Sequence, residues 1–170
     1  VDQYDFSGKQ LSVLGGNVEY TFKNHHFFGE AAVQSTNSKA FVGGIITAVS
    51  KNIDVAFLHR NISKSFYGIY ANAFVENWEG RNEIGNYLGV SLASVMNWKV
   101  NFYIDKFKNY WLVNQSTSLT NGKECLITAI RFFGKKTFLQ FLVKKKKIES
   151  LGKNESSDID NYRLTVTSPL

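Results

Sequence analysis

The strongest constraint on this chain is the alternation of apolar and polar residues in short runs. In the run 17–23, Val18, Tyr20 and Phe22 alternate with polar neighbours, and the run 98–105 repeats the pattern. Successive side chains of a strand point to opposite faces, so this period predicts a β-strand with one apolar and one polar face. The runs with this pattern, looser at 40–48 and 124–133, are 17–23, 40–48, 53–60, 88–93, 98–105, 124–133, 139–144 and 162–166. With a further strand after the turn at Asn24, we expect about nine strands.

The connections between these runs also follow a pattern, because short turns alternate with long polar stretches. The order from Ser50 onward is short, long, short, long, short, long, over the segments 50–52, 61–83, 95–97, 108–122, 134–136 and 145–160. Outer-membrane β-barrels have tight turns at their periplasmic end and longer loops at their extracellular end. The pattern therefore predicts an all-β fold, an antiparallel up-and-down meander that forms an outer-membrane β-barrel or part of one.

Hydropathy and aromatic content agree with strands that cross a bilayer. The mean hydropathy is slightly negative, and no window approaches the ~20 apolar residues of a spanning helix. Backbone groups in a bilayer must be hydrogen-bonded within the protein, which leaves a closed sheet once helices are excluded. Aromatic residues lie near strand ends, as at Trp98, Tyr110 and Trp111, where interfacial girdles are expected.

We expect residues 1–170 to form a single β-barrel domain that is a fragment of a larger barrel. The chain opens at Val1 in the middle of the pattern and has no signal peptide. Closed bacterial barrels also normally contain an even number of strands. Further strands or another chain would complete the barrel.

The polar face of the strands carries the candidate site residues. In a barrel this face lines the lumen, where opposite charges pair across strands and plug the interior, or line a water-filled pore. The sequence leaves both arrangements open, although the cost of an unpaired charge favours pairing. The lumen-facing candidates are Glu19, Glu30, Asp54, Arg60, Lys99, Asp105, Arg131 and Arg163.

No motif indicates catalysis, a metal site or a cofactor. His25 and His26, with Glu19 and Glu30 nearby, are potential metal ligands. Adjacent strand residues point to opposite faces, however, so a polar turn is the preferred interpretation. His59 lies near charged residues, but the chain has neither a nucleophile elbow nor a metalloprotease motif. We therefore expect a non-catalytic protein that binds no metal and no cofactor.

The net charge of +6 is scattered along the chain apart from four consecutive lysines at 144–147. Such a run can contact lipid phosphates at the headgroup level or a nucleic acid backbone. A solvated loop edge is the favoured interpretation. The single Cys125 excludes an internal disulfide.

Several aromatic-rich segments resemble a known family. They lie at 20–30, 58–61, 66–68, 72–74, 76–77, 82–83, 85, 87–89, 97–100, 105–107 and 110–112. Over about residues 17–147 the chain is similar to the β-barrel region of large Bacteroidota proteins that carry a helix-hairpin-helix segment upstream. The resemblance implies an outer-membrane barrel whose role is uncharacterised in that family. The upstream segment suggests contact with DNA, but it is not part of this sequence, so we expect no nucleic acid partner for these residues.

The sequence thus predicts an integral protein of the bacterial outer membrane that contacts membrane lipid and acts as a channel, a scaffold or a secretion- or uptake-linked component. The alternative is a soluble, lipocalin-like β-barrel that binds a small apolar ligand inside. Its apolar face would point inward and its polar face outward. The two hypotheses differ in the orientation of side chains such as Phe102 and Lys99.

Overall fold

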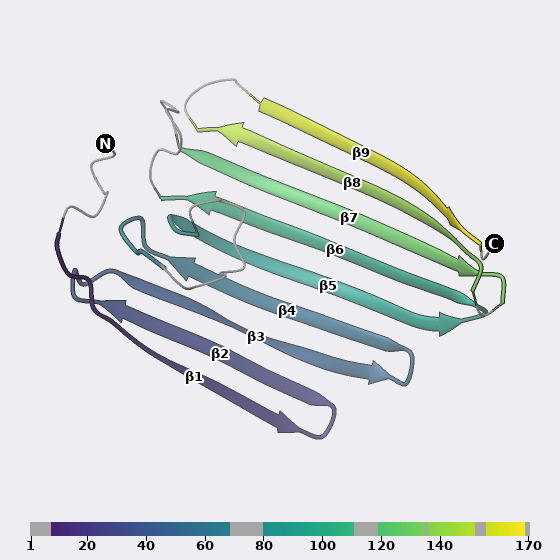
Figure 1. The fold of residues 1–170 in the computed structure, drawn as a ribbon, viewed down its shortest axis with the longest axis horizontal. Helices are drawn as coiled ribbons and strands as arrows, with labels where there is room; N and C mark the ends of the chain where they lie inside the picture. The colour runs from purple at the N-terminus through teal and green to yellow at the C-terminus, as the bar shows by residue number, and fades with distance from the viewer. Residues whose placement is uncertain (1–7, 69–79, 111–118, 135, 152–155, 169–170) are drawn as a thin grey trace.

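In a computed structural model, the chain forms a single antiparallel sheet (Figure 1). The structure describes residues 8–68, 80–110, 119–134, 136–151 and 156–168, and this part of the chain contains no helix. None of the described residues therefore belongs to a helix that could span a membrane. The strands are β1 (Val13–Phe22), β2 (His25–Gln34), β3 (Lys39–Ser50), β4 (Ile53–Ile62), β5 (Glu83–Val95), β6 (Trp98–Asn109), β7 (Thr120–Phe132), β8 (Phe138–Ser150) and β9 (Ser156–Thr167).

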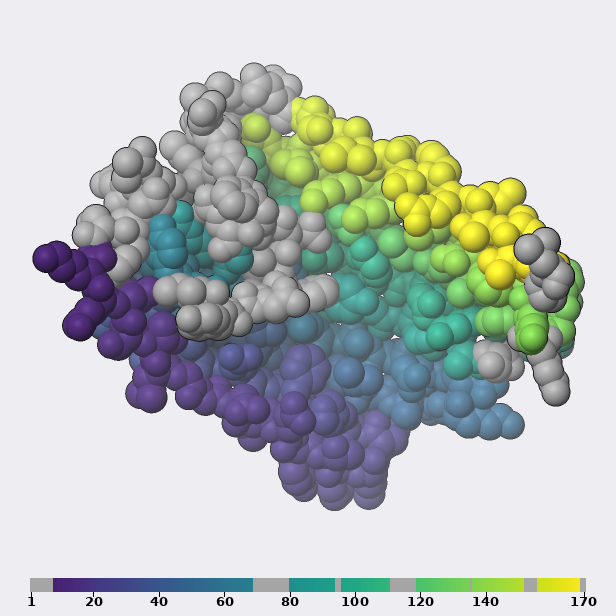
Figure 2. Space-filling view, in the orientation of Figure 1, coloured from purple at the N-terminus to yellow at the C-terminus, as the bar shows by residue number. Residues whose placement is uncertain are grey.

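The nine strands follow one another across the sheet in sequence order, and each pairs antiparallel with the next. The predicted all-β meander is therefore confirmed. β1 and β9 form the two edges of the sheet, and no pairing between them closes it into a barrel. In the space-filling view the strands lie side by side from β1, in purple, to β9, in yellow (Figure 2).

The turns at one end of the sheet are short, as the sequence predicts. They span 23–24, 51–52, 96–97 and 133–137, while the connections at the other end span 35–38, 63–82, 110–119 and 151–155. Both Met96 and Asn97 have positive φ, of 49° and 65°, as a type I′ hairpin turn requires. We call the two ends of the sheet the short-turn end and the long-loop end.

The prediction of a long loop at 145–160 is wrong. β8 continues to Ser150 and β9 begins at Ser156, so only 151–155 connects the two strands. The lysines at 144–147 lie within β8. Successive side chains of a strand point to opposite faces, so Lys144 and Lys146 pair with Glu124 on one face while Lys145 and Lys147 lie on the other. The strict alternation of short and long connections consequently ends before β9.

Register and alternation divide the strand side chains between two faces. The polar face bears Arg60, Asp105 and Glu124, which are buried, whereas the apolar face bears Phe57 and Ile127, which are 45% and 46% exposed. Other large exposed side chains of the apolar face are Leu14, Val18, Tyr20, Phe22, Phe27, Val33, Phe41, Leu88, Phe141, Tyr162, Leu164 and Val166. In the middle of the sheet, charged side chains of the polar face are therefore buried, whereas large side chains of the apolar face are exposed.

Part of the connection between β4 and β5 packs at the long-loop end of the sheet. Phe66 is buried there, as are Ile62 of β4 and Phe107 of β6. Gln34 fixes the segment through both of its amide atoms, because it donates to the backbone oxygen of Tyr67 and accepts from the backbone nitrogen of Tyr67. The sequence predicts this segment only as a polar loop, since its contacts come from distant strands.

Candidate functional site

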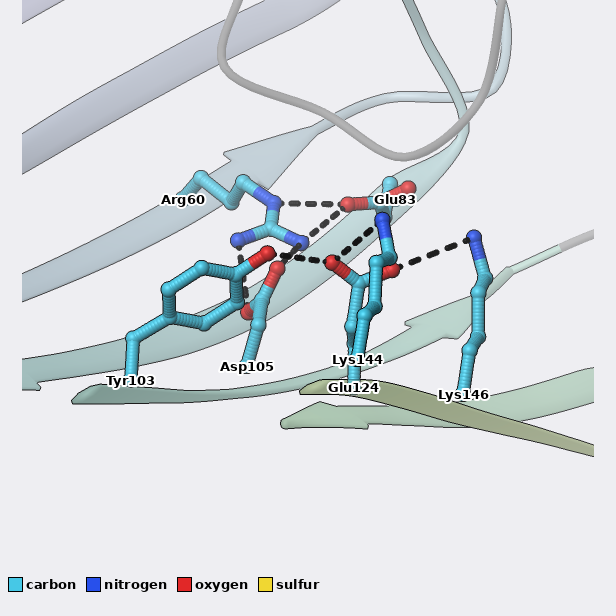
Figure 3. Close-up of polar contacts among 7 residues, drawn as sticks. All are labelled: Arg60, Glu83, Tyr103, Asp105, Glu124, Lys144 and Lys146. Atoms are coloured by element: carbon cyan, nitrogen blue, oxygen red, sulfur yellow. Dashed lines mark hydrogen bonds and ion pairs between the residues drawn. The ribbon is translucent and has the colours of Figure 1, made fainter. Parts of the chain in front are cut away.

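The largest group of buried charges lies on the polar face around Arg60 of β4 (Figure 3). The Nε atom of Arg60 donates to Oε1 of Glu83 at 2.6 Å. Its Nη1 and Nη2 atoms donate to the two carboxylate oxygens of Asp105 at 3.0 and 2.9 Å. This bidentate geometry suits the planar guanidinium group and fixes its orientation. Arg60 thereby links β4 to β5 and to β6, which is two strands away.

A glycine makes room for the guanidinium group. Gly85 of β5 lies opposite Arg60 in the register, and a Cβ atom at Gly85 would lie 2.5 Å from Cζ of Arg60. Gly122 of β7 has the same role next to Phe107, whose ring would overlap an added Cβ. Glycine in a strand commonly marks such a close approach.

Glu124 of β7 forms the second centre of the site and is 2% exposed. Its Oε1 atom accepts a hydrogen bond from the hydroxyl of Tyr103 at 2.5 Å. The same oxygen forms an ion pair with Nζ of Lys144 at 2.8 Å. Nζ of Lys146 lies 3.8 Å from the other carboxylate oxygen and 5.3 Å from the ring centroid of Phe107. Figure 3 shows both lysines and Tyr103 directed toward Glu124.

Charges in this cluster balance, because three cationic side chains face three carboxylates. We call it the buried charge network, and its members are Arg60, Glu83, Tyr103, Asp105, Glu124, Lys144 and Lys146. Buried ions lose their hydration and are stable only when partners compensate for it. The contacts join β4, β5, β6, β7 and β8, so the network can fix their register.

Arg60 and Asp105 are the two predicted site residues that the structure brings together. Five others lie on the polar face but are exposed, and none forms an ion pair with a described residue: Glu19, Glu30, Asp54, Lys99 and Arg163. They lie toward the edge strands or the short-turn end, beyond the reach of the network.

Arg131 differs from the prediction, because it lies on the apolar face. Its guanidinium group stacks over the ring of Trp98 at 5.3 Å and donates to the backbone oxygen of Met96 at 2.7 Å. Polar residues occur on both faces of 124–133, so the sequence alone assigns the face of Arg131 poorly. Trp98 thus lies at the short-turn end of the apolar face, while Trp111 lies outside the described residues.

Sequence reasoning missed five members of the network: Glu83, Tyr103, Glu124, Lys144 and Lys146. Glu83 falls in a predicted loop, and Lys144 and Lys146 belong to a run interpreted as a loop edge. A signal existed in the period-2 pattern, since Lys144 and Lys146 share a face and the register sets Glu124 opposite Lys146. That register depends on the exact length of the turn, which is predicted at 134–136 and spans 133–137 in the structure.

Each of the three histidines is hydrogen-bonded to a polar side chain of a neighbouring strand. The ring of His25 is hydrogen-bonded to Thr47 and that of His26 to Thr21, on opposite faces of β2. His59 pairs with Asn86 on the apolar face, away from Arg60. No group of three or more His, Cys, Asp or Glu residues suited to a metal ion occurs among the described residues.

Comparisons with known proteins assign no family to the chain, since it matches no family model, no curated protein and no solved structure at a significant level. Its role is therefore inferred from the buried charge network and the two faces of the sheet.

Proposed function

We propose that this chain is part of the wall of an integral outer-membrane β-barrel, with a non-catalytic role as a channel, a scaffold or a secretion- or uptake-linked component. The observation that carries the proposal is the uncovered apolar face of the sheet. Leu14, Phe57 and Leu164, on strands at both edges and in the centre, are 76%, 45% and 61% exposed. Soluble monomers rarely expose apolar patches of this extent, whereas hydrocarbon is the natural environment for such a face.

The exposed side chains of the apolar face form a band across the sheet, which we call the apolar band. The course of this band supports strands that are tilted in a membrane. On β1 the band includes Val18, whose register row runs through Gly29, Gly43, His59, Asn86, Lys106, Lys123, Lys147 and Asp158. On β9 the band is centred on Leu164, closer to the short-turn end than Asp158. The band therefore crosses the register rows obliquely, as it must when barrel strands tilt by about 35–45°.

The burial pattern is the opposite of that in a soluble, lipocalin-like barrel. Such a barrel would bury Phe57 and Leu164 around a ligand and turn Arg60 and Asp105 toward water. Here Arg60 and Asp105 are 0% and 2% exposed. Ion pairs that exclude water favour a lumen that is plugged at the level of the network over a water-filled pore.

The proposal requires further strands or another chain at β1 and β9. Each edge presents backbone groups along a strand that has one neighbour, and unpaired backbone groups are not tolerated in hydrocarbon. The partners of this sheet are therefore barrel-completing strands and membrane lipid.

Membrane insertion can be tested in phosphatidylcholine vesicles with the chain refolded together with the strands or chain that pair with β1 and β9. We expect the protein to float with the vesicles, to resist alkaline extraction and to need detergent once lipid is removed. A stable water-soluble monomer would contradict the proposal and favour the lipocalin-like alternative.

A pair of adjacent substitutions sharpens the test. Leu164 lies on the apolar face and Thr165 on the polar face of β9. An arginine at mid-membrane depth on a lipid-facing position costs about 2–4 kcal/mol, whereas an arginine on the polar face would not contact lipid. Leu164→Arg should therefore impair insertion strongly and Thr165→Arg should not.

A further inference from the structure

The four-lysine run at 144–147 is divided between the two faces of β8. Lys144 and Lys146 turn inward to Glu124, while Lys145 and Lys147 lie on the apolar face. The outward pair adjoins two lysines on neighbouring strands, because the register places Lys106 opposite Lys123 and Lys123 opposite Lys147. We call Lys106, Lys123 and Lys147 the lysine row.

The lysine row places like charges directly opposite one another on adjacent strands. Such pairs are destabilising unless something compensates for them. Lys147 has a carboxylate partner in Glu149 at 2.6 Å, but Lys106 and Lys123 form no ion pair with any described residue. A shallow hollow lined by Lys123, Lys145, Lys147 and Asp158, among others, lies beside the row. The excess positive charge is therefore concentrated on β6 and β7.

The row lies at the boundary of the apolar band. One step toward the short-turn end, the same strands present Ile104 and Cys125, and the next step presents Phe102 and Ile127. In a membrane strand, the residues that follow the apolar band lie at the level of the lipid headgroups.

We propose that the lysine row binds the phosphate groups of anionic lipids in the leaflet at the long-loop end. This inference rests on the proposed membrane location. Lysine is suited to the position, because its alkyl chain lies along apolar surface while its ammonium group reaches the headgroups. Phosphates would also neutralise the like charges of Lys106 and Lys123, which lie opposite each other in the register.

The test uses the protein in bilayers with spin-labelled lipid, and compares the protein-bound fractions of phosphatidylglycerol and phosphatidylcholine. The variant is Lys106→Gln/Lys123→Gln. Its control, Lys23→Gln/Lys51→Gln, removes the same charge from exposed turns at the short-turn end. Insertion of each protein into pure phosphatidylcholine is measured first by flotation.

We expect the wild type to prefer phosphatidylglycerol, and to lose up to about five-fold of that preference per lysine removed. The control should keep it, and added salt should weaken it through screening. An inserted wild type without preference, or an equal loss in both variants, would overturn the lysine row as a lipid site while leaving the membrane location intact. Failure to insert would overturn both proposals.

Discussion

At the scale of single residues, the buried charge network depends on a position that has no side chain. Gly85 leaves the space that the guanidinium group of Arg60 occupies. We predict that Gly85→Ala destabilises the protein by about 1–3 kcal/mol, the usual cost of overpacking. The free energy of unfolding in urea, measured in detergent micelles, checks this.

Gly16→Ala is the matched control for that substitution. A Cβ at Gly16 would meet no atom within 4 Å, so its unfolding free energy should stay within about 0.5 kcal/mol of the wild type. If both glycine variants were equally stable, Gly85 would not be the residue that makes room for Arg60.

Arg60 itself should be the most sensitive charged position. Arg60→Met leaves the carboxylates of Glu83 and Asp105 buried without their shared cation, which costs about 3–5 kcal/mol when a buried pair is broken. Adding Glu83→Gln and Asp105→Asn should recover part of this loss in the same urea titration. Arg163→Met, at an exposed position of the polar face, should change little.

The sequence predicts the face of residues such as Arg60 and Asp105, since face follows from alternation within a strand. It does not predict their partners. Partners depend on register between strands, and the register of β4 against β5 follows a connection of 63–82 that has no turn signature. Glu83, at the end of that connection, could therefore not be assigned to the network from the sequence.

At the scale of elements, alternation within a strand and the length of its turns explain which strands were predicted well. Short turns and clean alternation define β6, whose start at Trp98 agrees with the prediction. β8 extends past its predicted end because its lysines alternate between Glu124 on one face and open surface on the other. A charge run has no hydrophobic period, so the sequence cannot distinguish this strand from a loop.

Two adjacent lysines of β8 test that description. Lys144→Gln should lower the free energy of unfolding measurably, because it leaves the buried carboxylate of Glu124 with a weaker set of partners. Lys145→Gln removes an exposed pair with Asp160, and exposed pairs contribute at most about 1 kcal/mol. Equal effects of the two changes would mean that β8 does not alternate between faces at this point.

At the scale of the whole molecule, the edges and the faces of the sheet place different demands on its surroundings. Water would solvate the edges β1 and β9 but would leave a continuous apolar face exposed. Hydrocarbon would accept that face but requires both edges to be paired. The sequence predicts the orientation of the faces from alternation. It cannot predict closure, because closure depends on what pairs with β1 and β9, and each of these strands has one neighbour among the described strands.

The most direct test of the account is a nitroxide scan along β9 in phosphatidylcholine bilayers. Single cysteines at 162–166 would be introduced in a Cys125→Ser background and labelled. The account predicts that collision with oxygen, which concentrates in hydrocarbon, peaks at 162, 164 and 166, while 163 and 165 are shielded from lipid. Oxygen peaks at 163 and 165, or access of a polar nickel chelate to 162, 164 and 166, would contradict a lipid-facing apolar face.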